Sequence, residues 1–208
     1  MLELFRSYRY YYLLAFVYIL IGLLTLLFLN KGELVLQLDE GHTPFADSLF
    51  LGLTMLGELF GGALVLVCLI IFAKRRYIAI FIAAASLSMV ISQGLKHLVF
   101  ENEGRPSSVY EDLAPVKSLD RHRNNSFPSG HTTGAFTFCT LLALGLKKKW
   151  IQVLAPTLAA LVGISRVYLG QHFLSDIVAG AVIGLFVASL TVLLFNRLLP
   201  PKEYVAEN

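Results

Sequence analysis

The sequence predicts an all-α membrane protein, a six-transmembrane-helix bundle with its active site at the outer membrane interface. Hydrophobic residues make up 56% of the 208 residues and charged residues only 15%, and the mean hydropathy is +0.69. Several apolar stretches approach or exceed the roughly 18 to 20 residues that cross a bilayer as a helix. Basic residues collect in the turns on one side of these stretches. This composition excludes a water-soluble globular domain.

The expected spans cover residues 11–29, 49–72, 77–99, 132–146, 151–168 and 174–199. The first is longer than the core of a signal peptide and lacks a small-residue cleavage site, so we expect it to stay as a span. The second and third each carry one residue of full charge, Glu58 and Lys96. The fourth is short, and we expect it to begin slightly inside the outer boundary or to tilt little. The fifth and sixth carry Arg166 and Asp176 near the loop that joins them. Repeats and linkers are missing from the sequence, which predicts a single domain over residues 1–208.

Basic residues set the orientation of the spans. They lie before the first span, between the second and third, between the fourth and fifth, and after the sixth: Arg6, Arg9, Lys74, Arg75, Arg76, Lys147, Lys148, Lys149, Arg197 and Lys202. All these positions fall on one side of a six-span bundle, which the positive-inside rule makes cytoplasmic. The loop at 30–48 is rich in acidic residues and fits the outside. We therefore expect both termini in the cytoplasm of a bacterium and the protein in its plasma (inner) membrane.

Charge and cysteine content exclude several other functions. The formal net charge of +3 is accounted for by the topology-setting clusters, so we infer no nucleic-acid partner. Cys68 and Cys139 lie in apolar stretches and are expected to be buried thiols, neither a disulfide nor a metal pair. The sequence indicates no cofactor, no metal site and no obligate protein partner.

Ionisable residues within or at the lip of a span are costly, and their default interpretation is functional. They occur in four groups: "KHLVFENEGRP" with Lys96 and Arg105, "PSGH" with Ser129, Gly130 and His131, "SRVYLGQHFLSD" with Arg166, His172 and Asp176, and Glu58 in "TMLGELFGG". At about 1.5 Å of rise per residue, His131, Arg166 and Lys96 each lie roughly 24 to 30 Å from the basic end of their span. Residues from four helices are therefore expected to converge near the outer interface.

Three of these residues are cations, which predicts an anionic ligand. Arginine suits tetrahedral oxyanions such as phosphate, and lysine adds a point charge. Ser129 and Gly130 begin a helix, whose free N–H groups bind anions, and Gly130 lets the backbone approach closely. Lys96, Arg105, Arg166 and the "PSG" turn are therefore predicted to bind phosphate.

The two histidines complete a reaction. His172 and Asp176 are four residues apart, so they share a face if the helix has already begun. A carboxylate on one imidazole nitrogen makes the other a better nucleophile, and His131 can protonate the leaving oxygen and later take a proton from water. The pattern predicts phosphoryl transfer through a phosphohistidine without a metal. Taken singly, His131 could be a helix cap, His172 and Asp176 a helix-stabilising pair, and Arg166 a snorkelling side chain. These structural explanations would all have to coincide at one membrane depth.

The series "RP", "PSGH" and "SRxxxxxHxxxD" resembles the three-part signature of the type 2 phosphatidic acid phosphatase superfamily, over about residues 96–176. The resemblance implies a six-helix membrane lipid phosphatase. It assigns His172 as nucleophile, Asp176 as its orienting carboxylate and His131 as general acid. It implies phosphate binding by Lys96, Arg105, Ser129, Gly130 and Arg166. The first part departs from the family pattern, because the lysine would be expected at Leu98, two residues after Lys96. Either the "ENEG" turn carries an insertion or the role of the lysine is weakened.

Glu58 is outside this signature and has two interpretations. It could pair with an active-site cation or tune substrate binding. Alternatively it could make a structural hydrogen bond to a neighbouring helix, with Gly57 and Gly61 marking a close helix contact. The sequence leaves both open.

The leading functional hypothesis is a membrane lipid phosphatase whose site faces the exterior, acting on a lipid phosphate or diphosphate. Phosphatidic acid, phosphatidylglycerophosphate, an isoprenyl diphosphate and a lipid A phosphate all fit, and the loop at 107–125 is the expected selector. A lipid phosphotransferase with the same intermediate is the alternative. A transporter is disfavoured, because its ionisable groups would lie near the midplane. A haloperoxidase is disfavoured because that chemistry belongs to soluble members.

Overall fold

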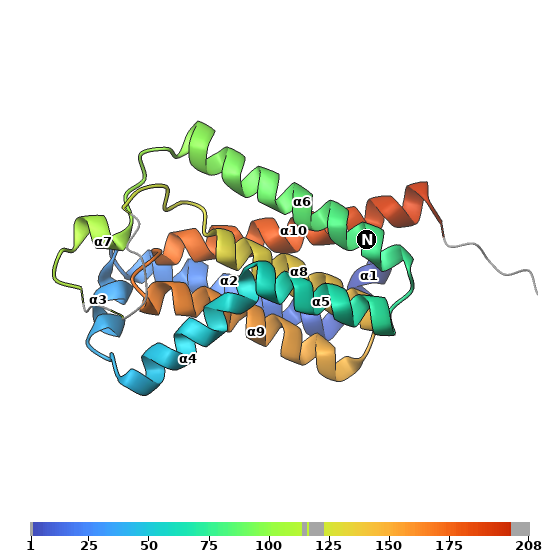
Figure 1. Cartoon of the computed structure of the whole chain (residues 1–208), viewed down its shortest axis with the longest axis horizontal. Coiled ribbons are helices and arrows are strands. Elements are labelled where there is room, and N and C mark those ends of the chain that lie inside the picture. Colours follow the sequence, from blue (N-terminus) through green and yellow to red (C-terminus); the bar gives the residue numbers. More distant parts are fainter. Residues whose placement is uncertain (1, 114–115, 117–122, 201–208) are drawn as a thin grey trace, which may run out of the picture.

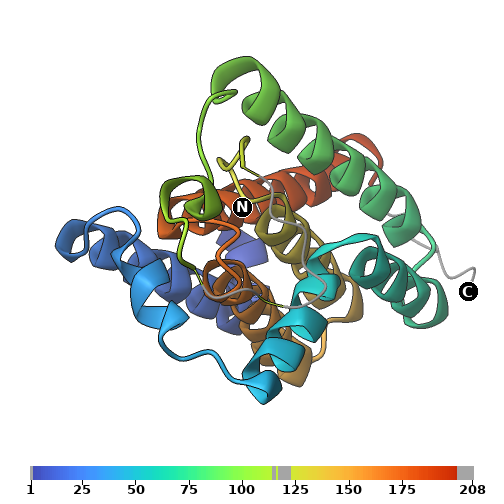
Figure 2. The ribbon, with the colours of Figure 1, turned by 60° about the vertical axis from the view of Figure 1, so that its left-hand side comes forward.

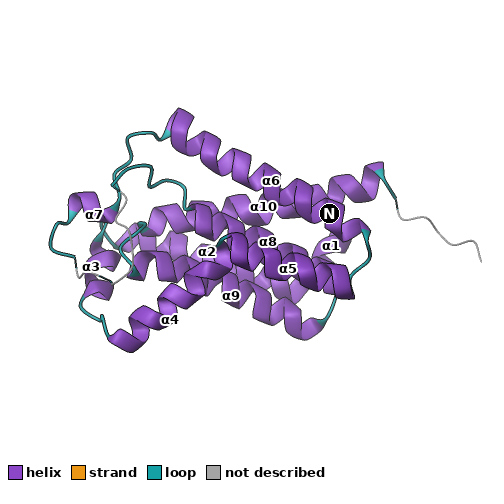
Figure 3. Cartoon of the chain, in the orientation of Figure 1, coloured by secondary structure: helices purple, strands orange, loops and turns teal. Residues whose placement is uncertain are grey.

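The computed structural model describes residues 2–113, 116 and 123–200. Within these residues all regular structure is helical, which confirms the predicted all-α class (Figure 3). The elements are α1 (Leu2–Ser7), α2 (Arg9–Phe28), α3 (Glu33–Asp39), α4 (Pro44–Thr54), η1 (Met55–Gly57), α5 (Leu59–Phe72), α6 (Arg76–Gly94), η2 (Leu95–Val99), α7 (Pro106–Val109), α8 (Gly130–Leu146), α9 (Lys149–Tyr168) and α10 (Leu174–Leu198).

Four helical segments of the described chain are long and apolar enough to cross a membrane: Arg9–Phe28, Arg76–Val99, Lys149–Tyr168 and Leu174–Leu198. The α4–η1 and α5 pair is a fifth if it is counted as one span. Helix α8 has 17 residues, close to the lower limit for crossing. The chain is therefore an integral membrane protein, and the count of six spans stays a prediction.

The second expected span differs from the prediction. Residues 49–72 do not form one continuous helix, because α4–η1 and α5 meet at Glu58 with a bend of 58°. The backbone of Glu58 is extended there, at φ −106° and ψ −167°. A hydropathy pattern registers only that a stretch is apolar, so it cannot show a change of direction within that stretch.

Helix α8 forms the centre of the bundle and packs against α5, α6, α9 and α10 (Figure 1). Small residues make this possible. A Cβ on Gly180 would come within 2.7 Å of the Ser129 carbonyl oxygen, and one on Gly184 within 3.0 Å of the Thr137 nitrogen. Two threonine hydroxyls of α8 donate to carbonyl oxygens one turn earlier, at 2.8 Å for Thr137 and 2.6 Å for Thr140. Close helix approach and internally satisfied hydroxyls are typical of membrane helices.

The described basic clusters share one end of the bundle. The Tyr8 hydroxyl donates to the Leu144 carbonyl at 3.0 Å, and Arg76 donates to the Asn196 side chain at 3.0 Å. These bonds join the start of α2 to the end of α8, and the start of α6 to the end of α10. Helices α3 and α7 lie at the opposite end (Figure 1). Lys202 is outside the described residues.

Candidate active site

The ends of α6, α8, α9 and α10 that lie near α3 and α7 carry the predicted site residues (Figure 2). Asp176 is in the first turn of α10, His131 in the first turn of α8, Arg166 in the last turn of α9, and Lys96 in η2 directly after α6. Gly130 is the first residue of α8, and the remaining members lie in connecting segments or at caps: Glu58, Arg105, Ser129 and His172.

His172 and Asp176 form a buried dyad. The Nδ1 atom of His172 lies 3.3 Å from Oδ2 of Asp176, and His172 is 1% exposed. The condition for a shared helical face is not met, because α10 begins at Leu174, after His172. Instead, Oδ2 of Asp176 accepts from the backbone N–H of Phe173 at 3.0 Å. This cap bond brings the carboxylate back to the loop that carries His172.

Two further contacts hold the Asp176 carboxylate. The Ser126 hydroxyl donates to Oδ2 at 2.6 Å, and the Ser175 hydroxyl donates to Oδ1 at 3.1 Å. Burial lowers the pKa of His172 below its ordinary value, an effect that the Asp176 hydrogen bond opposes. A low pKa keeps the imidazole neutral at physiological pH, and with Nδ1–H bonded to Asp176 the lone pair is on Nε2.

The start of α8 is docked on α10 beside this dyad. The Ser129 N–H donates to the backbone oxygen of Asp176 at 3.0 Å. The Ser129 side chain caps the helix, since its Oγ accepts from the Thr132 N–H at 3.4 Å and from the Thr132 hydroxyl at 2.9 Å. A Cβ on Gly130 would meet no atom closer than Ser92 Oγ at 3.8 Å. Ser129 is thus engaged in capping, whereas the backbone at Gly130 borders open space.

Three buried cations surround the same point. Lys96 is 7%, Arg105 8% and Arg166 4% exposed, and the Lys96 ammonium interacts electrostatically with both arginines and with Asp176. Arg105 is held by the Asn124 carbonyl at 3.0 Å and by the Gln171 side chain at 3.3 Å.

Arg166 is oriented in a similar way, through Thr54. An Nη of Arg166 donates to the Thr54 hydroxyl at 2.7 Å. Among the described residues, its Nε has no hydrogen-bond partner, and neither does the Ser92 hydroxyl beside Gly130. A buried guanidinium N–H with no protein partner is suited to an oxyanion ligand.

Lys96, and not the residue at position 98, is the one that lies among the buried site residues. Leu98, where the family pattern places the lysine, is 85% exposed, whereas Lys96 points inward. Residues 95–99 form a π-helical turn in which the Phe100 N–H reaches the Leu95 carbonyl at 2.9 Å. Such turns change the register of a helix and recur at functional sites. Lys96 is therefore the lysine that the fold brings to the cluster.

Glu58 reaches the second histidine. Its Oε1 accepts a hydrogen bond from Nε2 of His131, with side-chain exposures of 50% for Glu58 and 25% for His131. Because His131 is both a predicted site residue and part of the neighbouring helix α8, this bond fits both interpretations of Glu58. Gly57 marks a close contact with α8, since an added Cβ there would collide with the His131 carbonyl, whereas a Cβ on Gly61 would collide with Leu56 within the bend.

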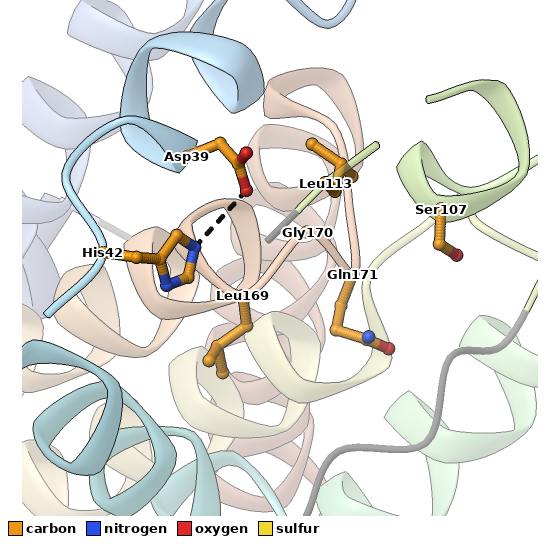
Figure 4. Close-up of a pocket in the computed structure, with 7 residues that line it drawn as sticks. All are labelled: Asp39, His42, Ser107, Leu113, Leu169, Gly170 and Gln171. Carbon is orange, nitrogen blue, oxygen red and sulfur yellow. Dashed lines mark ion pairs between the residues drawn. The ribbon is translucent and has the colours of Figure 1, made fainter. Parts of the chain in front are cut away.

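A small pocket lies beside the site (Figure 4). The pocket is lined by Asp39, His42, Ser107, Leu113, Leu169, Gly170 and Gln171. Of these, Ser107 and Leu113 belong to the expected selector loop. His42 interacts with Asp47 at 2.7 Å and with Asp39 at 3.5 Å. Residues 114–115 and 117–122 of the selector loop are outside the described residues. The described part brings the loop next to Gln171, which also contacts Arg105.

Sequence reasoning missed the residues that hold the charged groups, namely Thr54, Ser126 and Gln171. Each bonds a predicted site residue that is far away in sequence: Thr54 bonds Arg166, Ser126 bonds Asp176 and Gln171 bonds Arg105. A serine or threonine in an apolar chain carries no specific signal. Only the position of Gln171 within "LGQHF" could have marked it.

Comparison with known proteins adds three findings. Residues 77–200 match the model of the PAP2 superfamily. The lipid A 1-phosphatase of Porphyromonas gingivalis is 43% identical over 68 residues, and phosphatidylglycerophosphatase B of Bacillus subtilis 40% over 86 residues. These stretches are 32% and 37% of the present chain but only 15% and 41% of the two relatives, less than half of either. The crystal structure of LpxE from Aquifex aeolicus has a TM-score of 0.69 and 31% identity, covering 78% of this chain and 94% of that chain.

Proposed function

The chain belongs to the PAP2 superfamily, and from this premise we propose that it is a membrane lipid phosphatase that works through a phosphohistidine. The observation that carries the proposal is the His172–Asp176 dyad beside three buried cations and the first turn of α8. The names of the two curated relatives, a lipid A phosphatase and a phosphatidylglycerophosphatase, support a lipid phosphate as the substrate class.

The reaction would proceed in two steps. The Nε2 lone pair of His172 attacks phosphorus, the phosphorus–oxygen bond to the lipid breaks, and the leaving oxygen takes a proton from His131. Water then attacks phosphorus, its proton passes to His131, and the phosphorus–nitrogen bond breaks with its electron pair returning to His172. Lys96, Arg105, Arg166 and the Gly130 N–H stabilise the charge on the equatorial oxygens.

Loss of single groups tests this mechanism. We expect His172→Ala and His131→Ala to abolish phosphate release from all of the candidate lipids: phosphatidic acid, phosphatidylglycerophosphate, an isoprenyl diphosphate and a lipid A phosphate. Asp176→Asn should also lose most activity, because the imidazole loses its orienting acceptor. Phosphate release is measured with purified protein in detergent. In a second measurement, wild-type protein is quenched rapidly during turnover of a substrate with a radiolabelled phosphate. The label bound to the protein should be acid-labile and alkali-stable, as expected for a phosphohistidine.

His97→Ala is the matched control, because His97 is exposed and has no proposed role. It should keep wild-type activity. Near-normal phosphate release by His172→Ala would contradict the mechanism. Consumption of substrate without free phosphate, and with label on a second lipid or alcohol, would identify a phosphotransferase instead.

We also propose that the reaction needs no metal, because the cations and the helix start already supply positive charge where it develops. Phosphate release should continue in excess chelator. Vanadate should inhibit it by resembling five-coordinate phosphorus. Activity that is lost in chelator and restored only by added magnesium would contradict this proposal.

A further inference from the structure

The site contains a second histidine–carboxylate pair that the family signature does not include. Glu58 stands at the N-cap of α5, at the break between η1 and α5, and its carboxylate accepts from Nε2 of His131 on α8. The two residues are 73 positions apart in the chain. The pair is partly open to the surroundings, unlike His172 and Asp176.

The break holds Glu58 against α8 through backbone contacts. A Cβ on Gly57 would collide with the His131 carbonyl, and a Cβ on Gly134 would collide with the Gly57 carbonyl. The Gly62 N–H donates to the Glu58 backbone oxygen at 3.0 Å, which starts α5 directly after the break. Because η1 packs on the first turn of α8, the side chain of Glu58, the residue after Gly57, lies against the His131 imidazole.

The positive charges near His131 indicate what the Glu58 carboxylate does. Arg166 and Lys96 both interact electrostatically with the imidazole, and each disfavours a second positive charge nearby. A general acid must nevertheless carry a proton when the leaving oxygen needs it. A carboxylate on one ring nitrogen offsets the two cations and fixes the ring orientation, which leaves Nδ1–H to donate.

We propose that Glu58 is the positioning residue of His131, and that it matters most for phosphate monoesters of alcohols. This inference rests on the proposed phosphatase function. In the first step the bond from phosphorus to the ester oxygen breaks, and that oxygen takes the Nδ1 proton of His131 while Nε2–H stays bonded to Glu58. An alkoxide leaves poorly without a proton, whereas an aryl oxide with electron-withdrawing groups leaves readily. Glu58 should therefore affect alkyl substrates far more than activated aryl substrates.

The test compares two substrates on the same purified protein, a long-chain alkyl phosphate and a nitrophenyl phosphate with an alkyl chain of equal length. For Glu58→Gln we expect kcat on the alkyl phosphate to fall about tenfold or more, within the range that general acids contribute. On the aryl phosphate kcat should stay within about threefold of wild type. Glu58→Asp, which keeps a carboxylate, should retain more alkyl activity than Glu58→Gln. Glu101→Gln, which removes an exposed carboxylate in the turn after η2, should change neither rate.

The aryl rate reports whether each variant is folded, so a loss of structure cannot imitate the expected result. Equal losses on both substrates in Glu58→Gln, or no loss on either, would overturn the role of Glu58. If the wild-type protein cleaves neither of these substrates and none of the candidate lipids, the proposed phosphatase function is overturned instead.

Discussion

Gly130 has no side chain at the point where the proposed site would bind the phosphate. An added Cβ at this residue would fit without a clash, since the nearest atom is Ser92 Oγ at 3.8 Å. Alanine would also favour the helix more than glycine does. Packing within the described chain therefore gives no reason for a glycine at this position, whereas the approach of a phosphate to the backbone does.

We predict that Gly130→Ala folds normally but loses activity, by about tenfold or more, as expected when a preorganised donor is obstructed. Thermal unfolding in detergent and phosphate release measure the two effects separately. Gly52→Ala is the matched control, because Gly52 is exposed and an added Cβ there meets nothing within 4 Å. Full activity in Gly130→Ala would show that the α8 start is not the phosphate cradle.

At the scale of the elements, the joint between α8 and α10 decides the geometry of the site. Asp176 and the Ser129 turn are connected across this joint by a backbone hydrogen bond of 3.0 Å. The joint is closed by Gly180 and Gly184, whose Cα atoms face the α8 backbone. A displacement of α10 along α8 would therefore separate the nucleophile from the helix start.

We predict that Gly184→Val destabilises the protein and lowers activity without altering any site residue. An added Cβ would lie 2.9 Å from the Phe136 Cβ and 3.0 Å from the Thr137 nitrogen, and such overpacking costs about 1–3 kcal/mol. The midpoint of thermal unfolding should fall, and phosphate release should fall with it. Gly52→Val should leave the midpoint unchanged. An unchanged midpoint in Gly184→Val would mean that the helices separate easily.

At the scale of the whole molecule, the described basic clusters and the proposed site lie at opposite ends of the bundle (Figure 1). By the positive-inside rule we propose that the site lies at the outer face of the membrane. We propose that the phosphate to be cleaved is on a lipid of the outer leaflet, and that both termini are cytoplasmic.

Cysteine labelling tests this orientation. In a background without Cys68 and Cys139, a cysteine at Ser108, which is exposed near the site, should react with an impermeant maleimide added to intact cells. One at Ser7, exposed at the basic end, should react only after the membrane is opened. Ser118 would be a further outer position, but it lies outside the described residues. The reverse pattern would invert the topology and the choice of substrates, while leaving the phosphatase chemistry standing.

The sequence alone determined the class of the protein, most helix positions and the residue types of the site, because hydropathy and short motifs are local properties of the chain. The tertiary structure decided which of these residues meet. It turned Lys96 inward and Leu98 outward, placed His172 before α10, and broke the second expected span so that Glu58 reaches His131. It also paired Ser126 with Asp176 across 50 positions. These contacts depend on how closely glycine-bearing helix faces approach each other, and that distance is set by packing between segments far apart in the sequence.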